Sequence, residues 1–182
     1  MPAISWSNLT DFTPAPSWRF TCTLPTVAGT NLNGQKLSFQ VERISCPMPG
    51  INFEPAVFNS GERQFPNLRT IGAITISFIE DTNYSILQYL RAWKNLIIDD
   101  DGNYGLPASY KKQIQLQPYD ETGQSNITLS WSFCAPSQIE PYDFDGSQTR
   151  HVTCSVTFVV DAMDPLQPSG SNTSSGITQP SN

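Results

Sequence analysis

The chain has 182 residues, which suits one domain with a sizeable hydrophobic core. Charged residues make up only 14% of it, against about 25% in ordinary soluble domains, so the polar surface must consist largely of Ser, Thr, Asn and Gln. The net charge of −6 and the scarcity of clustered bases argue against a protein that grips nucleic acid. We expect neither a membrane-spanning segment nor a signal peptide, because no apolar run is long enough and the first residues lack a basic and apolar leader pattern.

An N-terminal arm is predicted over residues 1–16, where large apolar side chains occur among prolines without any periodicity. Apolar and polar residues then alternate over 18–24 and again over 37–42, with a segment rich in Gly and Asn between them. Alternation with a period of two is typical of a half-buried strand, and Gly and Asn favour a turn. These two segments together predict a β-hairpin.

Residues 45–68 interrupt the strand pattern and are predicted to form a long loop. Pro47 and Pro49 remove backbone donors that a regular strand needs, and scattered apolar residues follow them. A loop of this length without a core of its own is uncommon unless it has a function. Two interpretations remain open here: a contact with another subunit, or a cap over one end of a barrel.

A strand is predicted at 71–80 and a helix at about 83–98. In the helical segment the apolar residues recur at helical spacing, at Ile86, Leu90, Trp93 and Ile97. Just before it, Asp81, Thr82 and Asn83 offer side-chain oxygens that can cap a helix N-terminus. An acidic turn at 99–103 is expected to end the helix.

Strand patterns return after Pro107, at residues 113–117, 127–133 and 152–160. The segment 120–123 predicts a tight connection between the first two of these strands.

Three parts of the chain follow from this pattern: the arm at 1–16, a β domain at 17–162 that includes the loop at 45–68, and an extension rich in Ser, Gly and Pro at 163–182. The fold is predicted to be mainly β, a small barrel or sandwich of antiparallel strands with one flanking α-helix.

No catalytic, cofactor-binding or metal site is predicted. His151 is the single histidine, at the start of the last predicted strand, and the nucleophile and nucleotide-binding motifs of enzymes are missing from the sequence. Glu80 and Asp81 are adjacent on an extended strand and therefore point to opposite faces, so they cannot flank one substrate bond. We expect these two carboxylates to cap the helix or to bind a basic residue of a neighbour. The four cysteines, which are widely spaced, are expected to be reduced and packed.

The acidic turn resembles the first part of a calcium-binding loop, with Asp99, Asp101 and Asn103 at alternate positions. Tyr104 and Tyr110 stand where such a loop needs a Gly and a bidentate Glu. A structural turn is therefore the better interpretation.

A series of features follows one another in a characteristic order: Ile74–Asp81, a helix bearing Trp93, the turn Gly102–Gly105, the segment Tyr110–Leu116, the segment Trp131–Ile139 and the closing strand Val152–Val160. In order and spacing, these features over roughly residues 70–160 resemble the tail tube family of T4-like bacteriophages. The resemblance implies a non-enzymatic virion protein, six copies of which close into a ring. Rings would stack into the inner tube of a contractile tail, with sheath and baseplate proteins as partners and assembly in the host cytoplasm.

The resemblance also implies that viral DNA passes through the lumen during ejection and host entry, without specific binding. A lumen of Ser, Thr, Gln and carboxylates would let an anionic duplex slide past. The candidate lumen residues are Gln113, Gln115 and Gln117, or alternatively Thr153, Ser155 and Thr157.

Two alternatives remain open. One is a baseplate or tube-initiator relative, or the tube of another contractile injection system. The other is a carbohydrate-binding β-sandwich, for which Trp6, Trp18, Trp131 and the tyrosines would form the stacking platform.

Overall fold

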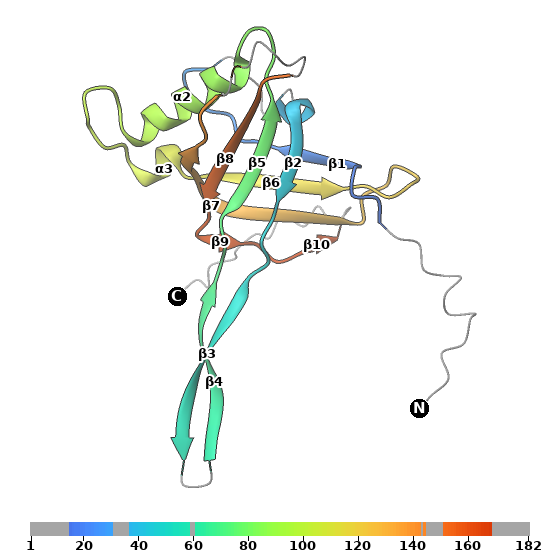
Figure 1. Ribbon diagram of the computed structural model, residues 1–182, viewed down its shortest axis with the longest axis vertical. Helices are drawn as coiled ribbons and strands as arrows, with labels where there is room; N and C mark the ends of the chain where they lie inside the picture. Colours follow the sequence, from blue (N-terminus) through green and yellow to red (C-terminus); the bar gives the residue numbers. More distant parts are fainter. Residues whose placement is uncertain (1–14, 31–36, 59–60, 143, 145–150, 169–182) are drawn as a thin grey trace, which may run out of the picture.

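The computed structural model describes residues 15–30, 37–58, 61–142, 144 and 151–168 (Figure 1). Most of the predicted arm and most of the predicted extension lie outside these residues. The elements are β1 (Phe20–Thr23), the 3₁₀ turn η2 (Ser38–Gln40), β2 (Val41–Ser45), β3 (Gly50–Phe58), β4 (Gly61–Thr70), β5 (Ile74–Ile79), α2 (Ser85–Ile97), α3 (Pro107–Tyr110), β6 (Lys112–Pro118), β7 (Ile127–Ile139), β8 (Thr153–Val159), β9 (Ala162–Met163) and β10 (Gln167–Pro168). The predicted fold is confirmed: antiparallel strands dominate and α2 is the one long helix among the described residues.

One strand, β7, joins two halves of the sheet. The strand order is β1-β6-β7-β8-β5-β2, with β9 and β10 also paired to β7. Residues of β7 up to Cys134 pair with β6, and Ala135–Ile139 pair with β8. We call β1, β6, β9, β10 and the first part of β7 the β6 half, and β2, β5, β8 and Ala135–Ile139 the β8 half. Figure 1 shows the strands of the two halves crossing steeply, as in an orthogonal sandwich.

A bulge lets β7 turn from one half into the other. Lys112 pairs with Cys134 while Ile114 pairs with Trp131, so β7 has one more residue than β6 over this stretch. Within the bulge, Phe133 has a left-handed backbone with φ of 58°. Such bulges bend strands and allow them to change sheets.

The core lies between the two halves and α2. Its fully buried members come from every part of this arrangement, including Cys22, Ile76, Phe78, Trp93, Ile114, Trp131, Val156 and Phe158. The ring of Trp93 lies 5.5 Å from that of Phe158, and its Nε1 donates to the Tyr110 carbonyl at 2.7 Å. The predicted apolar stripe of the helix is therefore the face that packs on the β8 half.

Glu80 and Asp81 cap α2, as predicted. The Glu80 carboxylate accepts hydrogen bonds from the backbone N–H groups of Ile86 (2.9 Å) and Leu87 (3.2 Å). The Asp81 carboxylate accepts one from the Ser85 N–H at 2.9 Å. Two carboxylates thus satisfy the free donors at the positive end of the helix.

The predicted hairpin of 18–24 and 37–42 is wrong. β1 pairs with β6, β2 pairs with β5, and residues 38–40 form a 3₁₀ turn. Alternation reports only that a strand has one buried side; it carries no information on which strand pairs with it.

The predicted loop at 45–68 is also wrong, because most of it is a hairpin. β3 and β4 pair from Gly50 and Thr70 at the base to Phe58 and Gly61 at the tip, and they project far from the sandwich (Figure 1). The hairpin continues the β2–β5 pair, since Ser45 and Thr75 are already opposite each other in the sheet. Prolines are tolerated in this two-stranded ribbon because both of its strands are edge strands.

Candidate assembly surfaces

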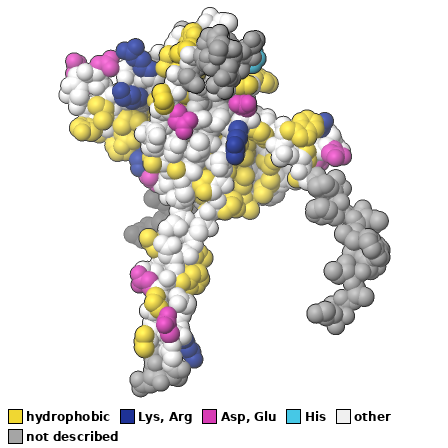
Figure 2. Space-filling model, in the orientation of Figure 1, with side chains coloured by type: hydrophobic (Ala, Val, Ile, Leu, Met, Phe, Trp, Pro, Cys, Tyr) yellow, Lys and Arg dark blue, Asp and Glu magenta, His cyan; other side chains and the backbone are white. Residues whose placement is uncertain are grey.

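The β3–β4 hairpin exposes its apolar side chains. Those with large exposed fractions are Ile51 (58%), Phe53 (55%), Val57 (83%), Phe65 (46%) and Leu68 (59%). Figure 2 shows hydrophobic atoms spaced along the hairpin, between charged ones. A two-stranded hairpin is marginally stable in water unless it packs against something, and exposed apolar patches mark interaction sites. The hairpin therefore has the chemistry of a docking element.

The β8 half has a free strand edge on each side. No described strand pairs with the outer edge of β2, nor with the outer edge of Ala135–Ile139 in β7. Each edge presents unpaired backbone groups that can template another strand. Pro136 fits this position, because prolines within sheets are confined to edges and bulges.

The face of the β8 half that points away from the core is covered with hydroxyl groups. The hydroxyls of Thr75 and Thr157 are 3.5 Å apart, and those of Ser77 and Ser155 are 3.0 Å apart. A shallow hollow on this face is lined by Arg43, Ser45, Thr75, Ser77 and Ser155. Because cross-strand neighbours bond to each other, these four hydroxyl groups already have hydrogen-bond partners within the face.

The two sets of candidate lumen residues lie on different halves. Thr153, Ser155 and Thr157 are on β8, within the hydroxyl-covered face. The glutamines are on β6, where the Gln113 amide donates to Asp164 at 3.0 Å and the Gln117 amide to Thr128 at 3.3 Å. The structure thus separates the two sets that the sequence could not rank.

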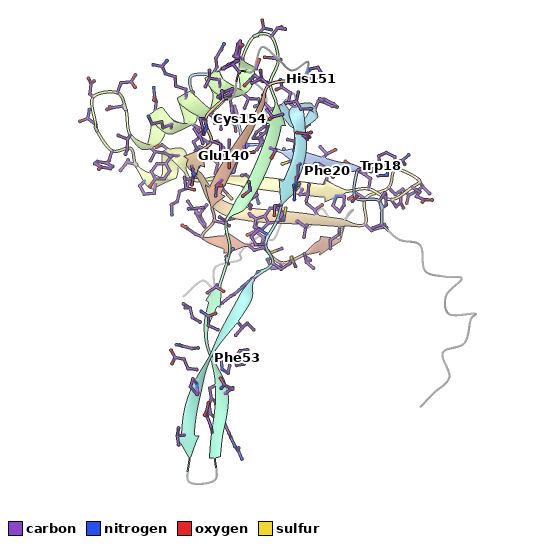
Figure 3. The ribbon with its side chains drawn as sticks, viewed as in Figure 1. Trp18, Phe20, Phe53, Glu140, His151 and Cys154 are labelled. Carbon is purple, nitrogen blue, oxygen red and sulfur yellow. The ribbon has the colours of Figure 1, made fainter. Side chains whose placement is uncertain are left out.

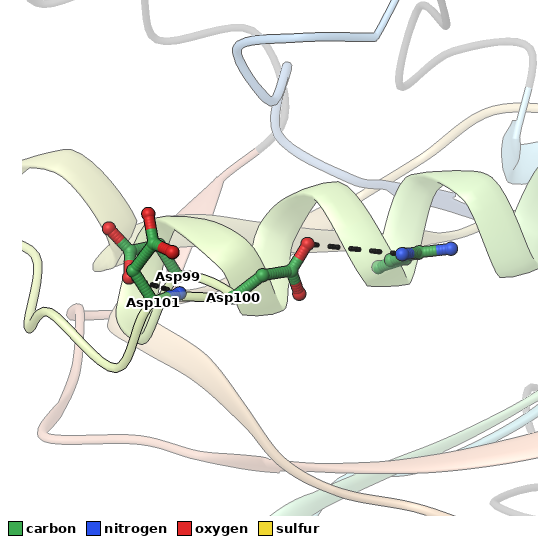
Figure 4. A network of polar contacts seen from close by, with 4 residues as sticks. Asp99, Asp100 and Asp101 are labelled. Carbon is green, nitrogen blue, oxygen red and sulfur yellow. Dashed lines mark hydrogen bonds and ion pairs between the residues drawn. The ribbon is translucent and has the colours of Figure 1, made fainter.

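In the acidic turn after α2, the Asp99 carboxylate accepts hydrogen bonds from other groups of the same turn (Figure 4). Asp99 Oδ1 accepts hydrogen bonds from the backbone N–H groups of Asp101 (3.0 Å) and Asn103 (2.8 Å), and Oδ2 accepts one from the Asn103 amide. These bonds, led by the one from the Asn103 side chain, lower the pKa of Asp99. Asp100 lies 3.9 Å from Arg91 on the surface. The arrangement is that of a turn, and no group of three metal-ligating side chains occurs in the described part of the chain.

The remaining sequence candidates do not come together. His151 is exposed at the entrance to β8, whereas Cys154 is buried (Figure 3). Burial raises the pKa of the Cys22 and Cys134 thiols to about 12, so they are packed, unreactive groups.

Trp131 cannot belong to a carbohydrate-stacking platform, because its ring is not accessible. Trp18 is exposed, Trp131 is fully buried, and Trp6 lies outside the described residues. None of the described helices is long and apolar enough to cross a bilayer.

Arg43 and Glu140 are two residues of the β8 half that sequence reasoning did not single out. Both are exposed: Arg43 is on β2, and Glu140 directly follows β7, where its N–H donates to the Ser155 carbonyl. Their positions relative to each other depend on the register of the strands, which a single sequence does not show. Only an alignment with detectable pairwise covariation could have indicated those positions.

Solved structures of contractile injection systems have the same fold. A chain from the extended sheath–tube complex of the extracellular contractile injection system PVC matches with a TM-score of 0.63 and 17% identity, over 91% of this chain and 99% of that one. The PVC sheath/tube terminator matches with a TM-score of 0.64 and 16% identity, over 86% and 99%. The tube-terminating cap of the anti-feeding prophage matches with 0.63 and 16%, over 86% and 93%.

Neither a protein-family model nor a curated protein sequence matches the chain. At 16–17% identity, the structural likeness extends over nearly the whole length of these neighbours. The chain therefore has the fold found in these contractile injection systems, mainly β with one principal helix.

Proposed function

We propose that this chain is a structural, non-enzymatic subunit, six copies of which close into a ring, and that the rings stack into the inner tail tube of a contractile-tailed phage. The observation that carries the proposal is the β8 half, four strands whose two outer edges have no partner strand in the described part of the chain. A sheet with two different free edges can join head to tail with copies of itself, and such heterologous contacts generate rings. The shared fold with contractile injection systems supports the same role.

The hydroxyl-covered face of the β8 half lines the lumen in this proposal. Joining the free edges makes one continuous sheet around the ring, with α2 on the opposite side from this face. The face would then present Thr75, Ser77, Ser155 and Thr157 to the channel. Hydroxyls that already bond to one another offer little grip to a passing DNA duplex, whose backbone is held chiefly by Lys and Arg.

The β3–β4 hairpin makes the contact between stacked rings. It projects beyond the sandwich and exposes apolar residues that need a partner. The predicted arm and C-terminal extension are further candidates for this contact. Sheath and baseplate proteins would bind the outside of the finished tube, and the protein would reside in the tail of the virion.

A second candidate role is that of a terminator or baseplate relative, or of the tube in another injection system. The PVC terminator and the anti-feeding prophage cap match this chain about as well as the sheath–tube complex does. Copy number per particle separates these roles, because a main tube subunit is present in many rings and a terminator in very few.

Negative-stain electron microscopy of the purified protein tests the proposal. Wild-type protein should form rings and stacked tubes. A variant in which residues 50–70 are replaced by a short turn should keep the β2–β5 pair and form rings that do not stack. A wild-type protein that stays monomeric at high concentration would refute the proposal, and tubes formed by the shortened variant would remove the hairpin from it.

A further inference from the structure

Two cross-strand rows run over the hydroxyl-covered face. In one row Ser45 pairs with Thr75, Thr75 with Thr157, and Thr157 with Gln138. This row is uncharged from edge to edge. Residues that are paired across strands share a face, so all four of its members project from the same side of the sheet.

The second row begins and ends with a charge. Arg43 pairs with Ser77, Ser77 pairs with Ser155, and the Glu140 N–H donates to the Ser155 carbonyl at 2.9 Å. The row is therefore Arg43, Ser77, Ser155, Glu140, with a cation on the free edge formed by β2 and an anion on the free edge formed by the end of β7.

Neither charge can be neutralised by the other within one chain. Four strands separate them by three strand spacings, about 14 Å. Both side chains are exposed, and neither forms an ion pair with any described residue. Two opposite charges at the two ends of one row are complementary only if one edge meets the other edge of a second molecule.

Strand direction permits this meeting. Neighbouring strands in the β8 half are antiparallel, so the first and last of its four strands run in opposite directions. When copies are related by rotation about a ring axis, β2 of one copy meets the end of β7 of the next in antiparallel orientation. Directly opposite side chains are then about 5 Å apart, and long side chains also reach the diagonal neighbours.

We propose that Arg43 of each protomer forms an ion pair with Glu140 of the next protomer, and that this pair sets the register of the joined edges. The occupant of each edge is a second copy of this chain. The inference rests on the ring of the proposed function and adds to it the residues that specify which edge meets which. The pair would close each charged row into a neutral, continuous row around the lumen.

Charge reversal tests the pair. Arg43→Glu leaves a protomer with acids at both edges, and Glu140→Arg leaves one with bases at both edges. Each variant alone should require at least about tenfold more protein to form rings, because every junction then brings like charges together. The double variant Arg43→Glu/Glu140→Arg should assemble within about threefold of wild type, since each junction again joins opposite charges.

Mixing the two single variants is the sharper experiment. In a ring of alternating Arg43→Glu and Glu140→Arg protomers, every junction joins an acid to a base, and an even-numbered ring closes without a mismatch. An equimolar mixture should therefore regain rings under conditions where neither variant forms them. Analytical ultracentrifugation measures the assembly, and native mass spectrometry of the mixture should find equal numbers of the two variants in each ring.

The control variants and the possible outcomes distinguish the proposed ion pair from ring formation as such. Arg91→Glu and Glu121→Arg make the same changes in net charge at exposed sites away from the row and should assemble as wild type does. Single reversals that form rings as readily as wild type, or a mixture no better than its components, would overturn the ion pair while leaving the ring intact. Wild-type protein without rings would overturn the proposed function and the pair together.

Discussion

The sandwich and the β3–β4 hairpin contain the same kinds of apolar residue in their strands, but these residues differ in whether they are buried within the chain. In the sandwich, Phe78 and Phe158 are fully buried between the two halves of the sheet. In the hairpin, Phe53 and Phe65 also lie in paired strands but are about half exposed. The sandwich supplies its own core, whereas the hairpin has apolar residues without one. The buried core and the exposed apolar side chains of the hairpin therefore lie in separate segments of this chain.

The largest expected difference is in the free energy of unfolding, between two Phe→Ala substitutions, one in the sandwich and one in the hairpin. Phe78→Ala should lower the free energy of unfolding by about 3–5 kcal/mol, because it removes a buried ring and leaves a cavity. Phe53→Ala should change it by less than about 0.5 kcal/mol, since the exposed ring has little to lose in the monomer. Chemical denaturation of the monomer measures both values. Equal losses would mean that the hairpin contributes to the folding core, and the comparison would fail.

Glycines in the two regions give the next contrast. A Cβ at Gly105 would lie 1.9 Å from the Leu96 backbone oxygen, at the end of α2. Gly105→Ala should therefore cost about 1–3 kcal/mol of stability, because backbone has to move. At Gly50, at the base of the hairpin, the nearest atom is the Thr70 hydroxyl at 3.1 Å, and that group can rotate away. Gly50→Ala should cost well under half as much in thermal denaturation.

Within the sandwich, two buried tryptophans differ in their N–H groups. Trp93 donates to the Tyr110 carbonyl, whereas the Trp131 Nε1 is buried and has no hydrogen-bond partner among the described residues. Trp93→Phe should lose more stability than Trp131→Phe, by about 1 kcal/mol, since only the first leaves a carbonyl unpaired. Urea denaturation of both variants tests the ranking. The reverse order would mean that Trp131 contributes more by volume than Trp93 does by its hydrogen bond.

Lowering the pH should have the smallest effect on stability, and it should act through the turns of the sandwich. Hydrogen bonds from the Thr122 side chain and the Gln124 backbone lower the pKa of Asp120 below its ordinary value of 3.8. The stabilisation is present above that ordinary value and is lost as pH falls through the lowered one. Asp120→Asn should therefore be slightly less stable than wild type at pH 7, and the difference should shrink below about pH 4. Melting temperatures measured from pH 7 down to pH 3 check the trend; a constant difference would contradict it.

Features that depend on near neighbours in the chain could be predicted from the amino-acid sequence. The helix at 85–97 follows from apolar spacing and from the carboxylates of Glu80 and Asp81, whose donors lie within seven residues. The tight connection at 120–123 is confirmed as well, since Asp120 bonds to the next few backbone N–H groups. The alternation in β5 and β8 gave the buried and exposed faces correctly, because a strand has only two faces.

The pairing of the strands, and the surfaces that this pairing exposes, could not be predicted from local sequence and are known from the three-dimensional fold. Nothing local indicates that β1 pairs with β6, that β7 bends at Phe133 to serve both halves, or that residues 50–70 form a projecting hairpin. Arg43 and Glu140 are separated by almost 100 positions and become ends of one row only through the register of three strand pairs. Pairing is set by the shared core and by the bulges that shift register, and both are properties of the whole chain rather than of any one segment.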